Sequence, residues 1–166
     1  QVHVYFDGAS RANPGPAGIG FVIYGKSLES STLYEVERFT QYIGYASNNI
    51  AEYRAALSAL RRALKHVVSH GSVRISGDSQ VVIKQLRAQW RTNNSILRKL
   101  RNAIRAVERR SNVSTEVQWS HVPRSLNKVA DALANKALDE AGFTRRQGQR
   151  DNQTNNQAST EGRECH

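Results

Sequence analysis

Four acidic residues of this chain occupy places from which their carboxylates can be brought together. Asp7 ends the apolar stretch VHVYF, and Asp78 ends the short apolar stretch SVRISG. Glu52 and Asp131 fall in the first turn of two segments whose apolar residues have helical spacing. Acids at strand ends and helix starts can converge on one point, where they repel one another strongly unless cations lie between them. The pattern therefore predicts a divalent-metal site formed by these four residues.

Such a site suits the hydrolysis of a phosphodiester. Two divalent ions can hold an attacking water and stabilise the leaving oxygen, and hard oxygen ligands favour Mg²⁺ or Mn²⁺. We expect Asp7 to bridge both ions, Glu52 and Asp78 to complete one ion site, and Asp131 to complete the more open one. In the alternative interpretation, Glu52 and Asp131 only complement the dipoles of their helices. That alternative leaves Asp7 and Asp78 unexplained.

The charge of the chain indicates the kind of partner. Lys and Arg outnumber Asp and Glu by 24 to 14, which gives a net charge of +10. A field of this sign favours nucleic acid or an anionic membrane. The sequence has no apolar run of membrane-spanning length, no amphipathic anchor and no lipidation signal, so we expect nucleic acid and no membrane.

Cysteine usage and the first residue bear on the compartment and on processing. The single cysteine, Cys165, cannot form an internal disulfide, which fits a reducing compartment and a cytoplasmic location. The chain begins with Gln1 rather than Met, which is expected of a processed chain or of a fragment.

The elements that must position the acids follow from the apolar patterns. Five segments read as strands: 2–7, 18–25, 32–45, 73–76 and 115–122. The first three follow one another through short links, which predicts an antiparallel meander. The last two alternate with helices, which implies parallel pairing through right-handed crossovers. We therefore expect an α/β fold with a mixed five-stranded sheet, three strands antiparallel and then two parallel, flanked by helices.

Helical spacing predicts four helices, over 49–70, 79–86, 95–110 and 126–141. Gly71 is expected to end the first helix, because glycine is favoured just past a helix end. The third helix is expected to bury Ile96, Leu100, Ile104 and Val107. We assign one domain to 1–143. The remaining segment, 144–166, has too few apolar residues to order itself and is expected to be a disordered polar tail.

Four motifs, in this order along the chain, resemble those of type 1 ribonucleases H. They are Asp7-Gly8-Ala9-Ser10 with Asn13-Pro14-Gly15, the Ser47–Glu52 segment SNNIAE, Gly77-Asp78-Ser79-Gln80, and the N-x-x-AD-x-LA of Asn127 to Ala134. The resemblance covers residues 2–141. It implies a ribonuclease H-like fold and two Mg²⁺ or Mn²⁺ ions held by the four acids. It also implies an endonuclease that cuts the RNA strand of RNA–DNA hybrids to leave 5′-phosphate and 3′-hydroxyl ends. We expect a monomer.

The resemblance also implies a set of substrate-binding residues, because these positions match family positions that touch the hybrid: Asn13, Ser47, Asn48, Asn49 and Gln80. Short amides and hydroxyls suit a minor groove, where 2′-hydroxyls distinguish RNA from DNA. A local role is the alternative for three of them. Asn13 would then form a turn, and Ser47 or Asn48 would cap a helix.

Two departures from the family pattern matter. Typical bacterial members carry a histidine in a loop shortly before the last acid, whereas here His121 and Arg124 compete for that auxiliary catalytic role. The segment HVPRSLN resembles the VPR-x-x-N version of archaeal and plant-like members, and we favour Arg124. His121 would then be a strand residue packed beside Trp119.

The second departure is that the chain lacks the basic protrusion of many bacterial members. The stretch 84–110 is nevertheless strongly basic, with Glu108 as its single acid; its basic residues are Lys84, Arg87, Arg91, Arg98, Lys99, Arg101, Arg105, Arg109 and Arg110. We expect some of them to bind substrate phosphates. Two alternative functions remain, a hybrid-binding module without catalysis and the same chemistry on double-stranded RNA.

Overall fold

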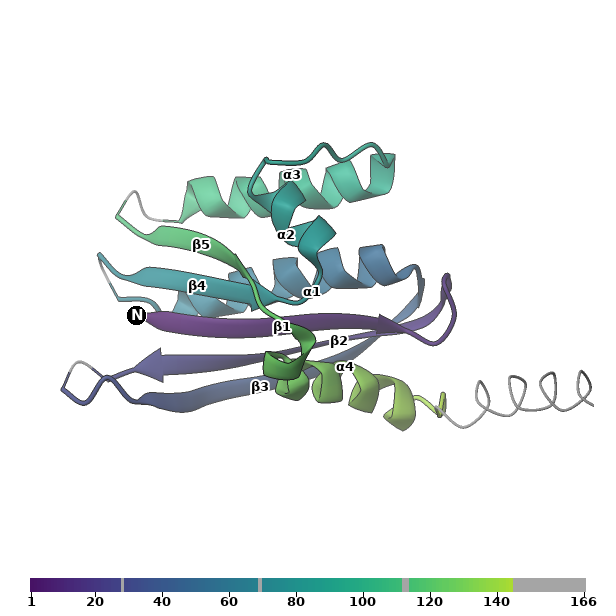
Figure 1. The fold of residues 1–166 in the computed structure, drawn as a ribbon, viewed down its shortest axis with the longest axis horizontal. Helices are drawn as coiled ribbons and strands as arrows, with labels where there is room; N and C mark the ends of the chain where they lie inside the picture. Colours follow the sequence, from purple (N-terminus) through teal and green to yellow (C-terminus); the bar gives the residue numbers. More distant parts are fainter. Residues whose placement is uncertain (28, 69, 112–113, 145–166) are drawn as a thin grey trace, which may run out of the picture.

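The computed structural model describes residues 1–27, 29–68, 70–111 and 114–144, and within these ranges five strands form one sheet (Figure 1). In chain order the strands are β1 (Val2–Ser10), β2 (Gly15–Lys26), β3 (Leu33–Ala46), β4 (Ser72–Gly77) and β5 (Glu116–His121). Their order across the sheet is β3-β2-β1-β4-β5. The pairs β1–β2 and β2–β3 are antiparallel, whereas β1–β4 and β4–β5 are parallel. The predicted α/β fold with a mixed sheet is confirmed.

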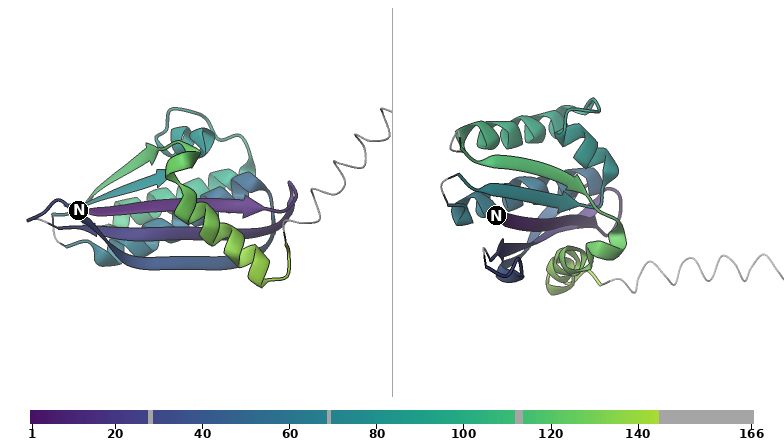
Figure 2. Two further views of the ribbon diagram at one scale, coloured as in Figure 1. Left: turned by 60° about the horizontal axis from the view of Figure 1, so that its bottom comes forward. Right: turned by 60° about the vertical axis from the view of Figure 1, so that its left-hand side comes forward.

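Helices cover both faces of this sheet. They are α1 (Asn48–Ala63), α2 (Gln80–Leu86), α3 (Ser95–Arg110) and α4 (Lys128–Glu140), with short 3₁₀ turns at Leu64–His66 and Arg124–Leu126. Helix α1 packs on β1 and β2, and α3 packs against α1. Helix α4 crosses the opposite face, over β1, β2 and β3 (Figure 2). The sheet therefore lies between α1 and α4, and both helices reach its central strand β1.

Two glycines let these helices approach the sheet closely at one place. A Cβ atom at Gly8 would lie 2.2 Å from the carbonyl carbon of Ala51 in α1. A Cβ atom at Gly20 would lie 2.4 Å from the backbone nitrogen of Ala134 in α4. Gly8 follows Asp7 in β1, and Gly20 is the residue of β2 paired with Asp7. The absence of side chains at these positions thus brings both helices near Asp7.

The cores on the two faces match the predicted apolar patterns with one exception. The apolar residues that α4 buries have the helical spacing from which this helix was predicted: Ala130, Leu133, Ala134, Ala137 and Leu138. In α3, however, Leu97 is buried whereas Ile96 is 51% exposed, so the predicted stripe was wrong at its first residue. Both residues have helical spacing to Leu100 and Ile104, and the packing of α3 on α1 selects Leu97.

Other element boundaries also differ from the prediction. Helix α1 ends at Ala63 rather than near residue 70, and Val67 is already extended, so Gly71 does not end the helix. The β-branched Val67 and Val68 favour that extended backbone. Helix α4 begins at Lys128 rather than Leu126, because the 3₁₀ turn Arg124–Leu126 precedes it.

Only Thr144 of the predicted tail is described, so the expectation of a disordered segment over 144–166 lies outside the described residues. Cys165 lies outside them as well. In the described part of the chain, the helices are too short or too polar to cross a membrane.

Candidate active site

Three of the predicted acids meet where β1, β4 and α1 come together. The last parallel pair of β1 and β4 is Tyr5 with Ser76. Asp7 lies two residues further along β1, and Asp78 lies two residues after Ser76, just beyond the end of β4 at Gly77. Glu52 reaches the same point from α1. One carboxylate oxygen of each acid lies within 4.8 Å of one oxygen of each of the others. We call Asp7, Glu52 and Asp78 the acid cluster.

The local positions of two cluster residues differ from the prediction. Asp7 does not end its strand, since β1 continues to Ser10 along β2; only the pairing with β4 stops before it. Glu52 lies beyond the first turn of its helix, because α1 already begins at Asn48. A favourable interaction with the end of the helix dipole therefore does not explain this glutamate, because that effect is confined to the first turn.

Two residues of the acid cluster are buried, Asp78 is half-buried, and the three carboxylates repel one another strongly. Asp7 and Glu52 are only 5% and 7% exposed. Burial and the charge of Asp78 raise the pKa of Asp7 to about 7, against the opposing effects of a hydrogen bond with Glu52 and the charge of Arg124. Burial and the neighbouring Asp7 raise the pKa of Glu52 well above its ordinary value. Ionising both residues in this place is therefore costly without a compensating cation.

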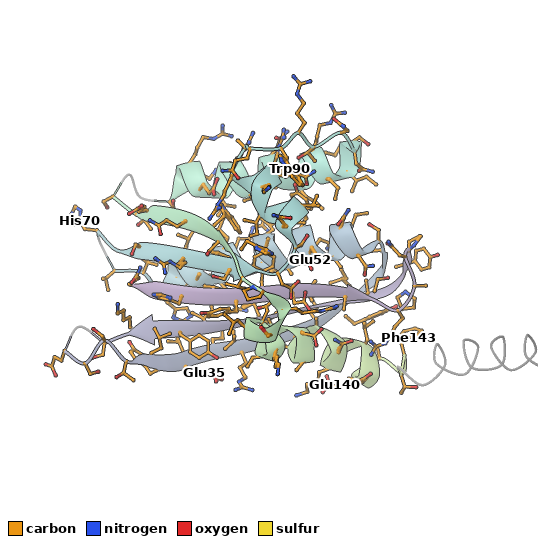
Figure 3. All side chains as sticks on the ribbon, viewed as in Figure 1. Glu35, Glu52, His70, Trp90, Glu140 and Phe143 are labelled. Atoms are coloured by element: carbon orange, nitrogen blue, oxygen red, sulfur yellow. The ribbon has the colours of Figure 1, made fainter. Side chains whose placement is uncertain are left out.

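A divalent cation fits this group of atoms. The Oε2 atom of Glu52 is buried and has no hydrogen-bond partner among the described residues. Glu52 is labelled in Figure 3. A buried carboxylate oxygen without a donor, close to two further carboxylates, is the ligand chemistry that hard cations such as Mg²⁺ prefer. The acid cluster can therefore hold a metal ion.

The fourth acid lies beside the cluster rather than within it. Asp131 is in the first turn of α4, as predicted, and its charge contributes to the raised pKa of Asp7. The side-chain amide of Asn135 donates to Asp131 Oδ1 at 3.1 Å and to the Asp131 backbone oxygen at 2.9 Å. Asp131 is thus near Asp7 but is held by its own helix.

The two candidates for the auxiliary role approach the acids from different elements. His121 ends β5, and its Nε2 atom lies 3.2 Å from the backbone oxygen of Asp78. Trp119 is buried whereas His121 is exposed, so the two do not form one packed face. Arg124 is exposed in its 3₁₀ turn, and its charge lowers the pKa of Asp7. Both are therefore near the acids, and the choice between them stays a prediction.

Sequence reasoning missed one residue of the site, Asn127. This side chain is only 1% exposed, and its Nδ2 atom donates to Asp78 Oδ2 at 3.0 Å and to the Phe6 backbone oxygen at 2.9 Å. It therefore fixes the Asp78 carboxylate against β1. The available signal was its place at the start of the N-x-x-AD-x-LA motif, which identified the motif but not this contact.

Three of the predicted substrate-binding residues make local hydrogen bonds at the start of α1, and two of them, Asn13 and Asn48, join it to the β1–β2 region. The Oδ1 atom of Asn13 accepts from the Asn48 backbone N–H at 3.1 Å, and Asn48 Oδ1 accepts from the Ser10 N–H at 3.1 Å. Ser47 caps α1, its hydroxyl oxygen accepting from the Ile50 N–H at 3.2 Å. Ser47 is thus the helix cap that was considered, whereas Asn48 does not cap α1 and instead binds the end of β1. A contact of these side chains with substrate remains a prediction.

The other two predicted substrate-binding residues are exposed on helices that border the site. Asn49 is the second residue of α1, and Gln80 is the first residue of α2, two positions after Asp78. Their placement leaves them accessible, and their contact with substrate also stays a prediction.

Four basic residues of α3 that precede its last turn divide into two groups. Arg98 and Lys99 are exposed. The Nε atom of Arg101 is buried, and the charges of Arg101 and Arg105 oppose the rise that burial causes in the pKa of Tyr53 in α1. Arg101 and Arg105 therefore face α1, and Arg98 and Lys99 face solvent.

A second exposed feature precedes α3. Trp90, labelled in Figure 3, is 44% exposed. The Lys84 ammonium lies 4.4 Å from the centre of its ring. Buried hydrogen bonds hold the surrounding segment on α1. The Tyr53 hydroxyl donates to Gln85 Oε1 at 2.7 Å, and Gln85 Nε2 donates to the Arg91 backbone oxygen at 3.0 Å.

Comparison with known proteins agrees with this geometry. The family model described as "Reverse transcriptase-like" matches residues 5–137. Ribonuclease HI of Halobacterium salinarum is 46% identical over 143 residues, which cover 85% of this chain and 66% of that protein. A bifunctional protein of Mycobacterium tuberculosis is 36% identical over 141 residues, covering 85% of this chain and 36% of that protein. This chain thus spans about two thirds of the first relative and about a third of the second.

Solved structures show the same relationship. RNase H1 of Halobacterium salinarum superposes with a TM-score of 0.73 at 42% identity, over 84% of this chain and 98% of that one. LC11-RNase H1 in complex with an RNA/DNA hybrid gives a TM-score of 0.74 at 29% identity, over 85% of this chain and 99% of that one. The shared fold, the order of the motifs and the level of identity show that this chain belongs to the ribonuclease H family, as a member of its type 1 group.

Proposed function

We propose that this chain is an endonuclease that hydrolyses the RNA strand of RNA–DNA hybrids and leaves 5′-phosphate and 3′-hydroxyl ends. The observation that carries the proposal is the acid cluster, in which three carboxylates lie within 4.8 Å of one another and a buried Glu52 oxygen has no donor among the described residues. A hybrid-binding module without catalysis has no use for so costly a group of charges. A hybrid is also the ligand of LC11-RNase H1, whose structure resembles this one.

The residues proposed to hold two Mg²⁺ or Mn²⁺ ions are Asp7, Glu52, Asp78 and Asp131. When bound, such ions supply Lewis acidity at the scissile phosphate and favour ionisation of an attacking water. The protein's own contribution is rigid placement of the ligands. Asn127 holds the Asp78 carboxylate through a 3.0 Å hydrogen bond, and burial excludes bulk water from Glu52.

Arg124 is our candidate for the auxiliary catalytic group. Its exposed guanidinium is close enough to the cluster for its positive charge to lower the pKa of Asp7. It can therefore orient the attacking water or stabilise negative charge on the departing group. His121 is the alternative. Its Nε2 atom lies 3.2 Å from the Asp78 backbone oxygen, which can only accept a hydrogen bond, so the ring is oriented by the backbone just after β4.

Substrate binding is assigned to two surfaces. The residues proposed to contact the hybrid's minor groove are Asn13, Ser47, Asn48, Asn49 and Gln80. Arg98 and Lys99 of α3 supply exposed positive charge for phosphates. We further propose that the chain acts as a monomer in the cytoplasm.

The test uses three labelled duplexes, an RNA–DNA hybrid, double-stranded RNA and double-stranded DNA, each with Mg²⁺, Mn²⁺ or EDTA. We expect cleavage of the RNA strand of the hybrid with either metal and none in EDTA, with the Asp7→Asn variant as the matched inactive control. Cleavage of double-stranded RNA as fast as cleavage of the hybrid would show that the chain is not specific for RNA–DNA hybrids. Tight hybrid binding without cleavage under any metal condition would show that the chain is a binding module.

A further inference from the structure

Asp131 is held by a series of hydrogen bonds that begins outside its own helix. Arg11 lies in the turn between β1 and β2, and its Nη1 atom donates to Asn135 Oδ1 at 2.5 Å. The Nδ2 atom of the same Asn135 donates to Asp131 Oδ1 at 3.1 Å. The turn that follows the Asp7 strand is therefore connected to the carboxylate of the fourth acid through one buried amide.

The chemistry of Arg11 determines which way this amide points. A guanidinium can only donate hydrogen bonds, so the oxygen of the Asn135 amide must face Arg11. The NH₂ group must then face Asp131, where it donates to the carboxylate. Asn135 is only 9% exposed, so water has little access to stabilise the reversed amide. Asp131 favours the same orientation, because a reversed amide would place its oxygen against the carboxylate; Arg11 reinforces this orientation and connects the amide to the β1–β2 turn.

Arg11 is itself firmly held at this place. Its Nη2 atom donates to Asp139 Oδ1 at 2.6 Å, and its Nε atom donates to the backbone oxygen of Phe143 at 2.7 Å. The side chain is only 15% exposed. An ordered arginine side chain loses conformational entropy. For Arg11 this cost is offset by charge-assisted hydrogen bonds to acceptors in α4 and just beyond it. The contacts fix the β1–β2 turn relative to α4.

The acids of the site reach their places by two different routes. The acid cluster is positioned by strand register and by the close approach of α1 to Gly8. Asp131 comes from the opposite face of the sheet, on α4. We propose that Arg11 and Asn135 are positioning residues that orient the Asp131 carboxylate toward the metal site and set its placement relative to Asp7. This inference rests on the proposed function, since it concerns the metal ligands of that site.

The test compares metal binding in variants of the whole chain. Arg11→Met removes the donors while keeping an apolar stem, Asn135→Ala removes the amide, and the double variant removes both. Asp139→Asn is the matched control, because it breaks the ion pair of Arg11 and leaves the link to Asn135 in place. Mn²⁺ binding is measured by calorimetry without substrate, and hybrid cleavage is measured across a Mg²⁺ titration.

We expect each single variant to weaken Mn²⁺ binding and to raise the Mg²⁺ concentration for half-maximal cleavage by about 10-fold or more, as for other residues that orient metal ligands. The double variant should bind Mn²⁺ no more weakly than the single variant with the lower affinity, because both changes break the same connection. Asp139→Asn should lower the melting temperature but change the Mn²⁺ affinity by less than about twofold. Arg11→Lys, which keeps the charge without the planar fork, should bind Mn²⁺ as weakly as Arg11→Met.

Several results would overturn the proposal. Unchanged Mn²⁺ affinity in folded Arg11→Met and Arg11→Lys proteins would show that Asp131 needs no support from the turn. Additive losses in the double variant would show that Arg11 does not act through Asn135. A loss in Asp139→Asn equal to that in Arg11→Met would indicate a general packing role. Normal metal-dependent cleavage by the unmodified chain in the same experiments would keep the proposed function intact in each of these cases.

Discussion

The acid cluster and the exposed part of α3 differ in how far their charges are exposed to solvent. Asp7 and Glu52 are 5% and 7% exposed and repel each other, and strand register and helix packing hold them together. Arg98 and Lys99 are exposed, and their charges are solvated. Desolvated charges are costly and must be compensated by a ligand, whereas solvated charges act weakly and over a longer range. We therefore expect substitutions in the acid cluster to affect the rate of cleavage, and substitutions on α3 to affect the salt dependence of hybrid binding.

The largest effect is expected at the centre of the cluster. Asp7→Asn should reduce hybrid cleavage to below about a thousandth of the unmodified rate, because metal-centred charge stabilisation contributes several kcal/mol to the transition state. In EDTA at about pH 8 the same change should raise the melting temperature, because it removes one desolvated, repelled charge. Near-normal turnover together with an unchanged melting temperature would mean that the cluster is not a metal site.

The next effect concerns the residues beside the cluster. Arg124→Ala should lower kcat by at least about tenfold, equivalent to about 1.4 kcal/mol of transition-state stabilisation, with little change in KM. His121→Ala should have a smaller effect. The two variants are compared in steady-state cleavage of one hybrid at saturating Mg²⁺. A folded but nearly inactive His121→Ala protein beside an active Arg124→Ala protein would reverse the assignment.

A smaller effect, confined to binding, is expected on α3. Replacing Arg98, Lys99, Arg101 and Arg105 together by Gln should weaken hybrid binding and lower the slope of log K against log salt concentration. Each lost phosphate contact should lower that slope by roughly 0.7–0.9, and we expect one or two contacts to be lost. Turnover at saturating substrate should survive.

Two double variants separate the contribution of the exposed basic residues from that of the residues that face α1. The Arg98→Gln, Lys99→Gln pair should reproduce most of the change in slope. The Arg101→Gln, Arg105→Gln pair should alter stability more than slope, because these residues face α1. Equal slopes for all the proteins across a salt titration would show that α3 is only a solvated surface.

The smallest effect is a pH dependence of the metal-free protein. The pKa of Asp7 is about 7 in the folded chain against an ordinary value of 3.8, so between these values the folded state binds more protons than the unfolded state. The free energy of unfolding contributed by this group must therefore increase as the pH falls from about 8 to about 5. Melting temperatures in EDTA should show this trend, and Asp7→Asn should reduce it. Identical trends in the two proteins would contradict the raised pKa.

Motifs and apolar periodicity were sufficient to predict the strands and the family, and to select the four acids as candidates. These features depend on neighbours along the chain: alternation identified β1, and the places of the acids at strand ends and helix starts predicted that their carboxylates could converge. Local patterns were insufficient where the sequence was compatible with more than one structure. Ile96 and Leu97 both fit the helical stripe of α3, and the first helix has no local signal strong enough to place its end at Ala63.

Tertiary structure alone decided which side chains complete the site. Asn127 reaches Asp78 across 49 positions of sequence, and Arg11 reaches Asn135 across 124. Such contacts depend on how α4 lies across the sheet, which is set by the combined burial of both surfaces and by the close approach at Gly20. Residue type and spacing determined that four carboxylates would be present. The packing of α1 and α4 on opposite faces of one strand determined that three form a buried cluster while the fourth is held separately beside it.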